Sequence, residues 1–131
     1  MIGLDTNVLV RYVMQDDPKQ AAQATKLVES LTTDAPGFVT VVTVVEFAWV
    51  LSACFELVRE DLGRALEALL RAKELVIEQA EVVWKAVRRF REGSADFADC
   101  LIELTSSAAG CHRTMTFDRA AARHAGMTLL A

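Results

Sequence analysis

Acidic residues at four places in the chain have the type and the setting for metal-ion chemistry. Asp5 ends a short apolar run, Glu46 lies in the apolar stretch that follows a second run, and Asp118 ends a third. Asp96 and Asp99 stand three residues apart between them. Two carboxylates about 4 Å apart repel each other by roughly 4 kcal/mol at an effective dielectric near 20. Converging acids therefore bind protons or share a cation, and carboxylate oxygens favour Mg²⁺ or Mn²⁺ over Zn²⁺.

The helix expected over 95–109 carries only negative charges. Asp96, Asp99 and Glu103 are spaced so that they share one face of this helix, and no Lys or Arg lies among them. A solvated helix face usually mixes both signs of charge. The pattern therefore favours a role for these acids other than solubility.

Helix capping competes with the metal-site interpretation for each acid taken singly. Asp5 and Asp118 each precede an expected helix and suit its N-cap. Thr43 and Glu46 have the spacing of a capping box, and Asp96 suits the positive end of a helix dipole. However, Asp5 and Glu46 are embedded in apolar sequence, which a surface cap does not need. The joint pattern therefore favours a shared site.

Short apolar strands alternate with helices along the whole chain. Strands are expected at 2–4, 38–42, 75–77, 113–117 and 127–130, and helices at 6–13, 18–31, 44–57, 61–73, 81–92, 95–109 and 118–125. This alternation predicts an α/β fold in one domain, 1–131, with a mainly parallel sheet covered on both faces. Ligands of such sheets bind beyond the carboxyl ends of the strands, where Asp5 and Asp118 fall.

Composition narrows the possible functions. The 131 residues are 53% hydrophobic, enough for one well-packed core. A net charge of −4 excludes binding to nucleic acid by gross positive charge alone. No apolar stretch is long enough to span a membrane and no secretory signal begins the chain, so a cytoplasmic location is expected. The three cysteines stand in apolar sequence and are expected to be reduced core residues.

The segments that carry the acids resemble, in the same order, the motifs of PIN-domain proteins. These segments are MIGLDTNVLV at 1–10, Val44-Val45-Glu46, SADFADCLI at 94–102 and Thr116-Phe117-Asp118-Arg119. The resemblance covers essentially the whole chain and is strongest with the VapC-type toxins of bacterial toxin–antitoxin pairs. It implies a three-layer α/β/α PIN-like fold and a Mg²⁺- or Mn²⁺-dependent endoribonuclease. It also implies a homodimer that a small antitoxin neutralises, with tRNA and rRNA as substrates to test.

By position, the resemblance assigns an acidic quartet to Asp5, Glu46, Asp99 and Asp118, with Asp96 as an additional acid. Asp5, Asp99 and Asp118, with Asp96 near them, would hold one or two divalent ions. Glu46 would steer the attacking water.

Other residues near these motifs would support the site. Thr6 and Asn7 would orient Asp5, and Thr116 would hydrogen-bond within the pocket. Basic residues are candidates to grip RNA phosphates, either close to the motifs or along one helix: Arg11, Arg113 and Arg119, and Lys85, Arg88 and Arg89. Trp49 and Phe55 suit either a dimer or antitoxin surface or the core.

Two alternatives remain open from the sequence. The first is a catalytically inactive PIN-like module that binds RNA or protein and whose acids are only helix caps. The second is a receiver-type signalling domain, which also holds Mg²⁺ with acids. A receiver needs an Asp at the end of a mid-chain strand and a Lys after a later strand, whereas here the mid-chain strand leads to Glu46 and no Lys follows Lys85.

Overall fold

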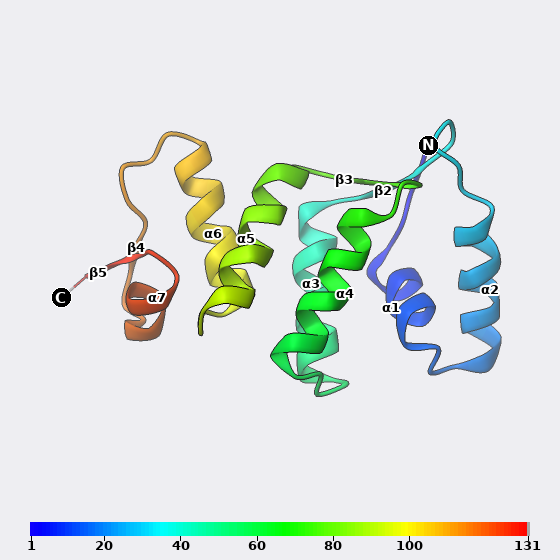
Figure 1. Ribbon diagram of the computed structural model, residues 1–131, viewed down its shortest axis with the longest axis horizontal. Helices are drawn as coiled ribbons and strands as arrows, with labels where there is room; N and C mark the ends of the chain where they lie inside the picture. Colours follow the sequence, from blue (N-terminus) through cyan, green and yellow to red (C-terminus); the bar gives the residue numbers. More distant parts are fainter. Residues whose placement is uncertain (131) are drawn as a thin grey trace. The chain divides into compact units, whose positions relative to one another are not determined.

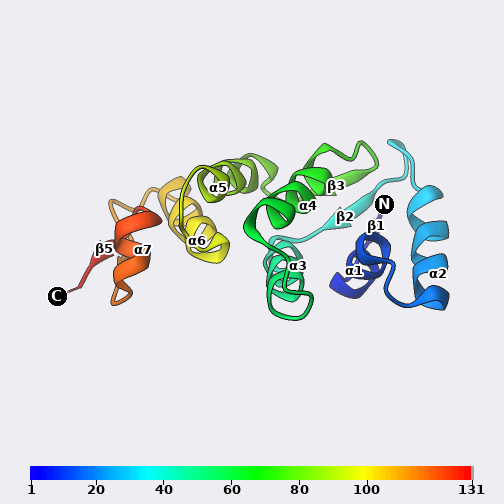
Figure 2. The ribbon, with the colours of Figure 1, turned by 60° about the horizontal axis from the view of Figure 1, so that its bottom comes forward.

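The computed structural model describes residues 1–130, which fall into two compact units. Unit 1 is Met1–Glu78, and unit 2 begins at Gln79. Gln79, the first residue of unit 2, has a positive φ of 52°. Figures 1 and 2 show the helices and strands of each unit.

Unit 1 is built around a parallel sheet. Its elements are β1 (Ile2–Gly3), α1 (Thr6–Met14), α2 (Pro18–Glu29), β2 (Gly37–Val39), α3 (Val41–Ala53), α4 (Arg59–Arg71) and β3 (Leu75–Ile77). β2 lies in the middle and pairs with β1 on one side and β3 on the other. Phe38 lies opposite Gly3 in one pairing and opposite Val76 in the other. Gly37 has to be small, because a Cβ there would lie 2.7 Å from Leu4 Cδ1.

The core of unit 1 anchors the helices that carry its acids. α1 packs against α2 and α3, and α3 packs against α4; α1 and α2 lie side by side in both ribbon views (Figures 1 and 2). Leu9 of α1, Phe47 of α3 and Leu66 of α4 are almost completely buried. Each such side chain contributes about 1.5–3 kcal/mol by leaving water. The first turns of α1 and α3 are therefore held in place by buried residues that follow them.

Unit 2 pairs two helices and adds a small parallel sheet. Its elements are α5 (Ala80–Glu92), α6 (Phe97–Ala108), β4 (Met115–Thr116), α7 (Arg119–His124) and β5 (Thr128–Leu129). α5 packs along α6, where the rings of Phe90 and Phe97 meet edge to face with their centroids 6.0 Å apart. In the small sheet, Met115 lies opposite Thr128.

The predicted α/β class with parallel strands is confirmed, because every strand pairing in the described part of the chain is parallel. The helix that was expected to begin at Val44 begins earlier, at Val41. Thr40 is its N-cap and accepts a hydrogen bond from the Thr43 N–H at 3.0 Å. The β-branched run therefore leaves the strand at Val39, because a threonine cap outweighs strand propensity there.

The cysteines differ from their expected setting. Cys100 is buried, but Cys54 and Cys111 are exposed. Cys54 ends α3 and Cys111 follows α6, and the ends of helices on the outside of a unit meet solvent. The prediction of three core thiols is wrong for these two.

None of the helices found in residues 1–130 combines the length and the apolar character that crossing a membrane requires.

Candidate active site

Asp5 stands at the N-cap of α1 without capping it. Its backbone is extended, and its carbonyl oxygen accepts hydrogen bonds from the Val8 and Leu9 N–H groups. Its carboxylate accepts no capping hydrogen bond and its side chain is exposed. The capping explanation is therefore wrong for the side chain of Asp5, which leaves it available for a ligand.

Glu46 is tied to the residue that follows Asp5. The hydroxyl of Thr6, the buried first residue of α1, donates a hydrogen bond of 2.5 Å to Glu46 Oε1. The expected capping box does not form, because Thr40 rather than Thr43 caps α3. The Thr6–Glu46 contact joins α1 to α3. Glu46 therefore contacts the residue that directly follows Asp5 in the chain. Asn7, expected to orient Asp5, is exposed.

In unit 2, two of the acids do cap helices. Asp96 Oδ2 accepts from the Asp99 N–H at 3.2 Å, and Asp118 Oδ1 accepts from the N–H groups of Ala120 and Ala121. Thr116 Oγ1 in turn accepts from the Asp118 N–H at 3.0 Å, which fixes the start of α7. Capping uses one oxygen of each carboxylate and leaves a second.

The carboxylate of Asp99 lies in the field of both caps. Burial raises its pKa above the ordinary value, and repulsion from Asp96 and then from Asp118 raises this pKa further. Asp99 is therefore repelled by both Asp96 and Asp118, and a divalent cation beside Asp99 would relieve that repulsion. This all-oxygen donor set fits Mg²⁺ or Mn²⁺. Residues 1–130 contain no group of three or more His, Cys, Asp or Glu side chains arranged to hold a metal ion.

The sequence matches the PIN domain family over residues 2–127, which run through both units. The chain belongs to the PIN domain family. PIN domains are generally nucleases, act on RNA and typically bind divalent metals. The family assignment removes the receiver-type alternative. No curated protein matches the chain with significant similarity.

Glu103 does not extend the acidic face of this PIN domain. Arg89 Nη1 donates to Glu103 Oε1 at 2.6 Å, and the Glu103 side chain is only 14% exposed. Asp96 precedes the helix instead of lying on its surface. The predicted stripe of three acids on α6 is therefore wrong. The pattern of α6 alone gave no sign of this, because the neutralising cation comes from α5.

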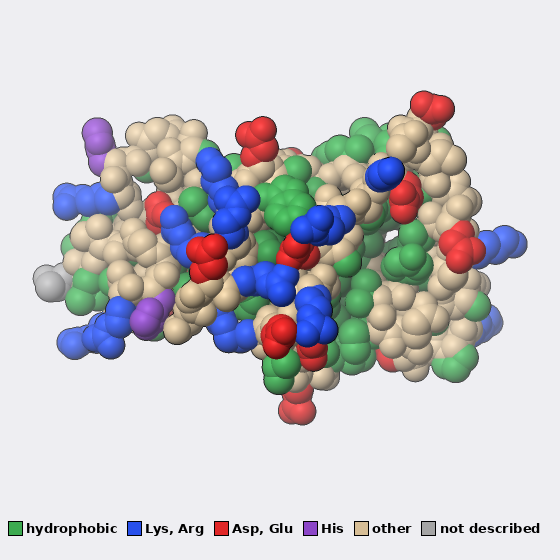
Figure 3. Space-filling model, viewed as in Figure 1, with side chains coloured by type: hydrophobic (Ala, Val, Ile, Leu, Met, Phe, Trp, Pro, Cys, Tyr) green, Lys and Arg blue, Asp and Glu red, His purple; other side chains and the backbone are tan. Residues whose placement is uncertain are grey.

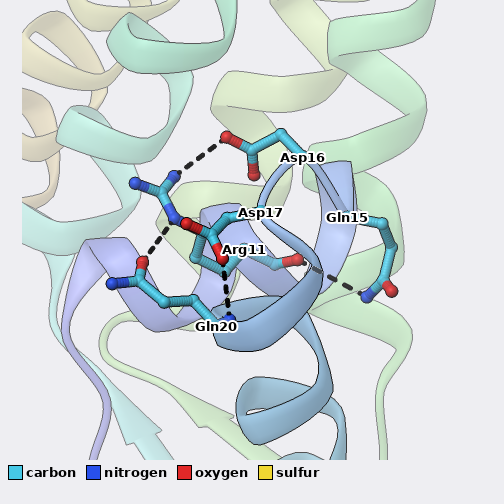
Figure 4. A network of polar contacts seen from close by, with 5 residues as sticks. All are labelled: Arg11, Gln15, Asp16, Asp17 and Gln20. Atoms are coloured by element: carbon cyan, nitrogen blue, oxygen red, sulfur yellow. Dashed lines mark hydrogen bonds and ion pairs between the residues drawn. The ribbon is translucent and has the colours of Figure 1, made fainter.

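The predicted substrate-binding arginines fall into two groups. Arg11 donates from Nε to Gln20 at 2.7 Å and pairs with Asp16 at 3.2 Å (Figure 4), so it braces the connection from α1 to α2. This engagement weakens the case for Arg11 as a ligand of RNA. Arg113 and Arg119 are exposed near β4 and α7 and stay predictions.

Proposed function

We propose that this PIN domain is a Mg²⁺- or Mn²⁺-dependent endoribonuclease of the VapC toxin type. The observation that carries the proposal is the position of Asp99, whose pKa is raised by its burial and then by repulsion from Asp96 and Asp118. In a family of nucleases that typically bind divalent metals, such repulsion supports a metal site.

We also propose that residues 1–131 form a single PIN-like domain with one metal site. Asp5, Asp99 and Asp118, with Asp96 beside them, would hold the ion, which would polarise the phosphodiester of the bound RNA. The family match supports this proposal, because it runs without interruption from Asp5 to Asp118.

Glu46 is proposed to orient the attacking water. Its Oε1 is held by the Thr6 hydroxyl, so its second oxygen is directed by the same contact. Attack of the water oxygen on phosphorus, in line with the leaving 3′-oxygen, breaks the P–O3′ bond; the water loses a proton to solvent, and the 3′-oxygen gains one from solvent. The products are a 5′-phosphate and a 3′-hydroxyl.

Asp5→Asn tests this function. We expect the variant to lose RNA cleavage by at least about a hundredfold, measured on a panel of tRNA and rRNA with Mg²⁺ and again with EDTA. Asp34→Asn, an exposed acid in the loop before β2, is the matched control and should cleave like the wild type. Full cleavage by Asp5→Asn would contradict the proposal.

One observation favours the alternative of a catalytically inactive PIN-like module. The side chains of Asp96 and Asp118 both cap helices. Calorimetric titration with Mg²⁺ separates the two functions. A nuclease should bind Mg²⁺ through Asp99, so Asp99→Asn should abolish the binding heat. An inactive module should give no specific heat in either protein.

The toxin type further implies a homodimer and a small antitoxin, which we propose bind the exposed side of α3. Val42 and Trp49 of α3 are 76% and 63% exposed, which is unusual for large apolar side chains, whereas Phe55 is half-buried. Trp49→Lys is expected to shift the protein towards a monomer in sedimentation experiments. An unchanged mass would argue against this surface.

A further inference from the structure

A hollow on unit 2 gathers basic side chains. It has a volume of about 320 Å³, within the range of small-ligand sites. Its lining comes from α5, the turn after α5 and the end of α7, and consists of Lys85, Arg88, Arg89, Glu92, Gly93 and His124. Figure 3 shows Lys and Arg side chains gathered over α5. We refer to this hollow as the α5–α7 pocket.

One of its cations is already fixed in position. Arg89 Nη1 donates to Glu103 Oε1 at 2.6 Å and to the Ala125 carbonyl oxygen at 2.7 Å. These two bonds hold the guanidinium between α6 and the end of α7. A group ordered in advance loses little conformational freedom when a ligand binds.

The other two cations are free to meet a ligand. Lys85 and Arg88 are exposed and form no ion pair with any residue that the structure describes. Glu103 neutralises Arg89 and Glu92 offsets one further charge, so the pocket keeps an excess of positive charge. Arginine and lysine together around one hollow favour an anion, and phosphate above all.

Two short segments of the chain connect residues that line the pocket to the acids of unit 2, and their lengths limit how far apart these can lie. Gly93 is three residues before Asp96, which bounds their separation at about 11 Å. His124 is six residues after Asp118 along α7, a rise of about 9 Å. At about 3.4 Å of rise per nucleotide in a duplex strand, this separation corresponds to a few nucleotides.

We propose that the α5–α7 pocket is a subsite for a backbone phosphate of the RNA strand, a few nucleotides from the bond that is cut. The inference rests on the proposed ribonuclease function and adds a second point at which the strand is held. Contacts to phosphate position a strand without reading its bases. The subsite therefore contributes affinity and register, and sequence preference arises elsewhere.

The double variant Lys85→Ala/Arg88→Ala tests the subsite. Both side chains are exposed, so the fold should persist, and the thermal midpoint checks this. Lys19→Ala/Lys26→Ala, which removes two exposed charges from α2, is the matched control. Affinity for a single-stranded oligoribonucleotide is measured by fluorescence anisotropy in EDTA, which prevents metal-dependent cleavage, at several salt concentrations.

We expect the Kd of the pocket variant to rise on the order of tenfold at low salt, and the slope of log Kd against log salt to fall by about 1. The control should change by less than about twofold. If the wild type cleaves RNA but the pocket variant binds like the control, or with an unchanged salt slope, the subsite is overturned and the ribonuclease function stands. A wild type that neither binds nor cleaves RNA would end the proposed function itself.

Discussion

Asp99 carries an electrostatic cost in the metal-free protein. Its carboxylate is partly buried beside Asp96 and Asp118, and these surroundings raise its pKa. Two of the other acids are stabilised by hydrogen bonds to their carboxylates. Asp118 accepts two from backbone N–H groups, and Glu46 accepts one from the Thr6 hydroxyl. A residue kept at a cost to stability is a strong candidate for function.

Asp99→Asn is therefore expected to stabilise the metal-free protein at neutral pH, by about 0.5 kcal/mol, while it abolishes RNA cleavage. Because folding raises the Asp99 pKa, the folded state binds this proton more tightly than the unfolded state. The free energy of unfolding of the wild type therefore falls as pH rises from 3.8 through the raised pKa, and this loss persists above it.

Thermal melts in EDTA at neutral pH and below pH 4 measure this difference. The gain from Asp99→Asn should shrink at the lower pH, where the wild-type carboxyl is protonated. Asp34→Asn, at an exposed acid in the loop before β2, is the control. A variant that is less stable than the wild type at neutral pH would contradict the electrostatic account.

At the scale of elements, the end of α7 is locked to α5 and α6 by one small cluster. Arg89 bridges Glu103 and the Ala125 carbonyl. Gly126, next in the chain, has φ +84°, and a Cβ there would lie 3.1 Å from both Arg89 Nη1 and Glu103 Oε1. Glycine is needed here for its backbone conformation and for the close approach of the ion pair.

Gly126→Ala should lower the free energy of unfolding by about 2 kcal/mol, since it adds backbone strain to a clash with the ion pair. Gly110→Ala is the matched control, because Gly110 also has a positive φ, 96°, but nothing lies within 4 Å of a Cβ there. Its cost should be strain alone, about 1 kcal/mol. If urea denaturation gave equal losses of stability for Gly126→Ala and Gly110→Ala, the Arg89–Glu103 ion pair would be able to move aside at no cost in free energy.

The start of α3 is a second element-scale feature with a measurable consequence. Thr40→Ala removes the oxygen that accepts from the Thr43 N–H and should cost about 1 kcal/mol. Thr33→Ala, in the exposed loop before β2, should be almost neutral. If Thr40→Ala were also neutral in chemical denaturation, the cap at Thr40 would not be what begins α3.

At the scale of the whole molecule, the acids that the PIN resemblance assigns to one set are distributed along most of the chain. Asp5 and Glu46 belong to unit 1, and Asp96, Asp99 and Asp118 to unit 2. The PIN family match spans both. A cation that binds the folded protein and not the unfolded chain raises the free energy of unfolding by mass action.

Mg²⁺ at a hundred times its Kd should therefore stabilise the wild type by about 2.7 kcal/mol. Asp5→Asn and Asp99→Asn should each lose most of this gain, and the double variant should lose little more than either single one. Thermal melts with and without Mg²⁺ give the four values. Losses that are partial and simply additive would show that the two acids do not serve one ion.

The sequence by itself determined the alternation of strands and helices, the apolar faces and the positions of the acids. These follow from local periodicity and capping, which act over a few residues. The helix expected from residue 18 does begin at Pro18, where Asp17 caps it and the proline suits the first helical position. The motifs likewise led to the PIN domain family, which the family match confirms.

Only the tertiary structure decided which polar groups are partners. Arg89 and Glu103 are 14 residues apart, and Thr6 and Glu46 are 40 apart, so no local pattern relates them. The sequence left Glu103 on an acidic face and left Glu46 with two interpretations, a capping box and a shared acidic site. Packing of α5 against α6 and of α1 against α3 moved both elsewhere, because a charged or hydroxyl group that becomes half-buried must find a hydrogen-bond partner among the residues packed against it.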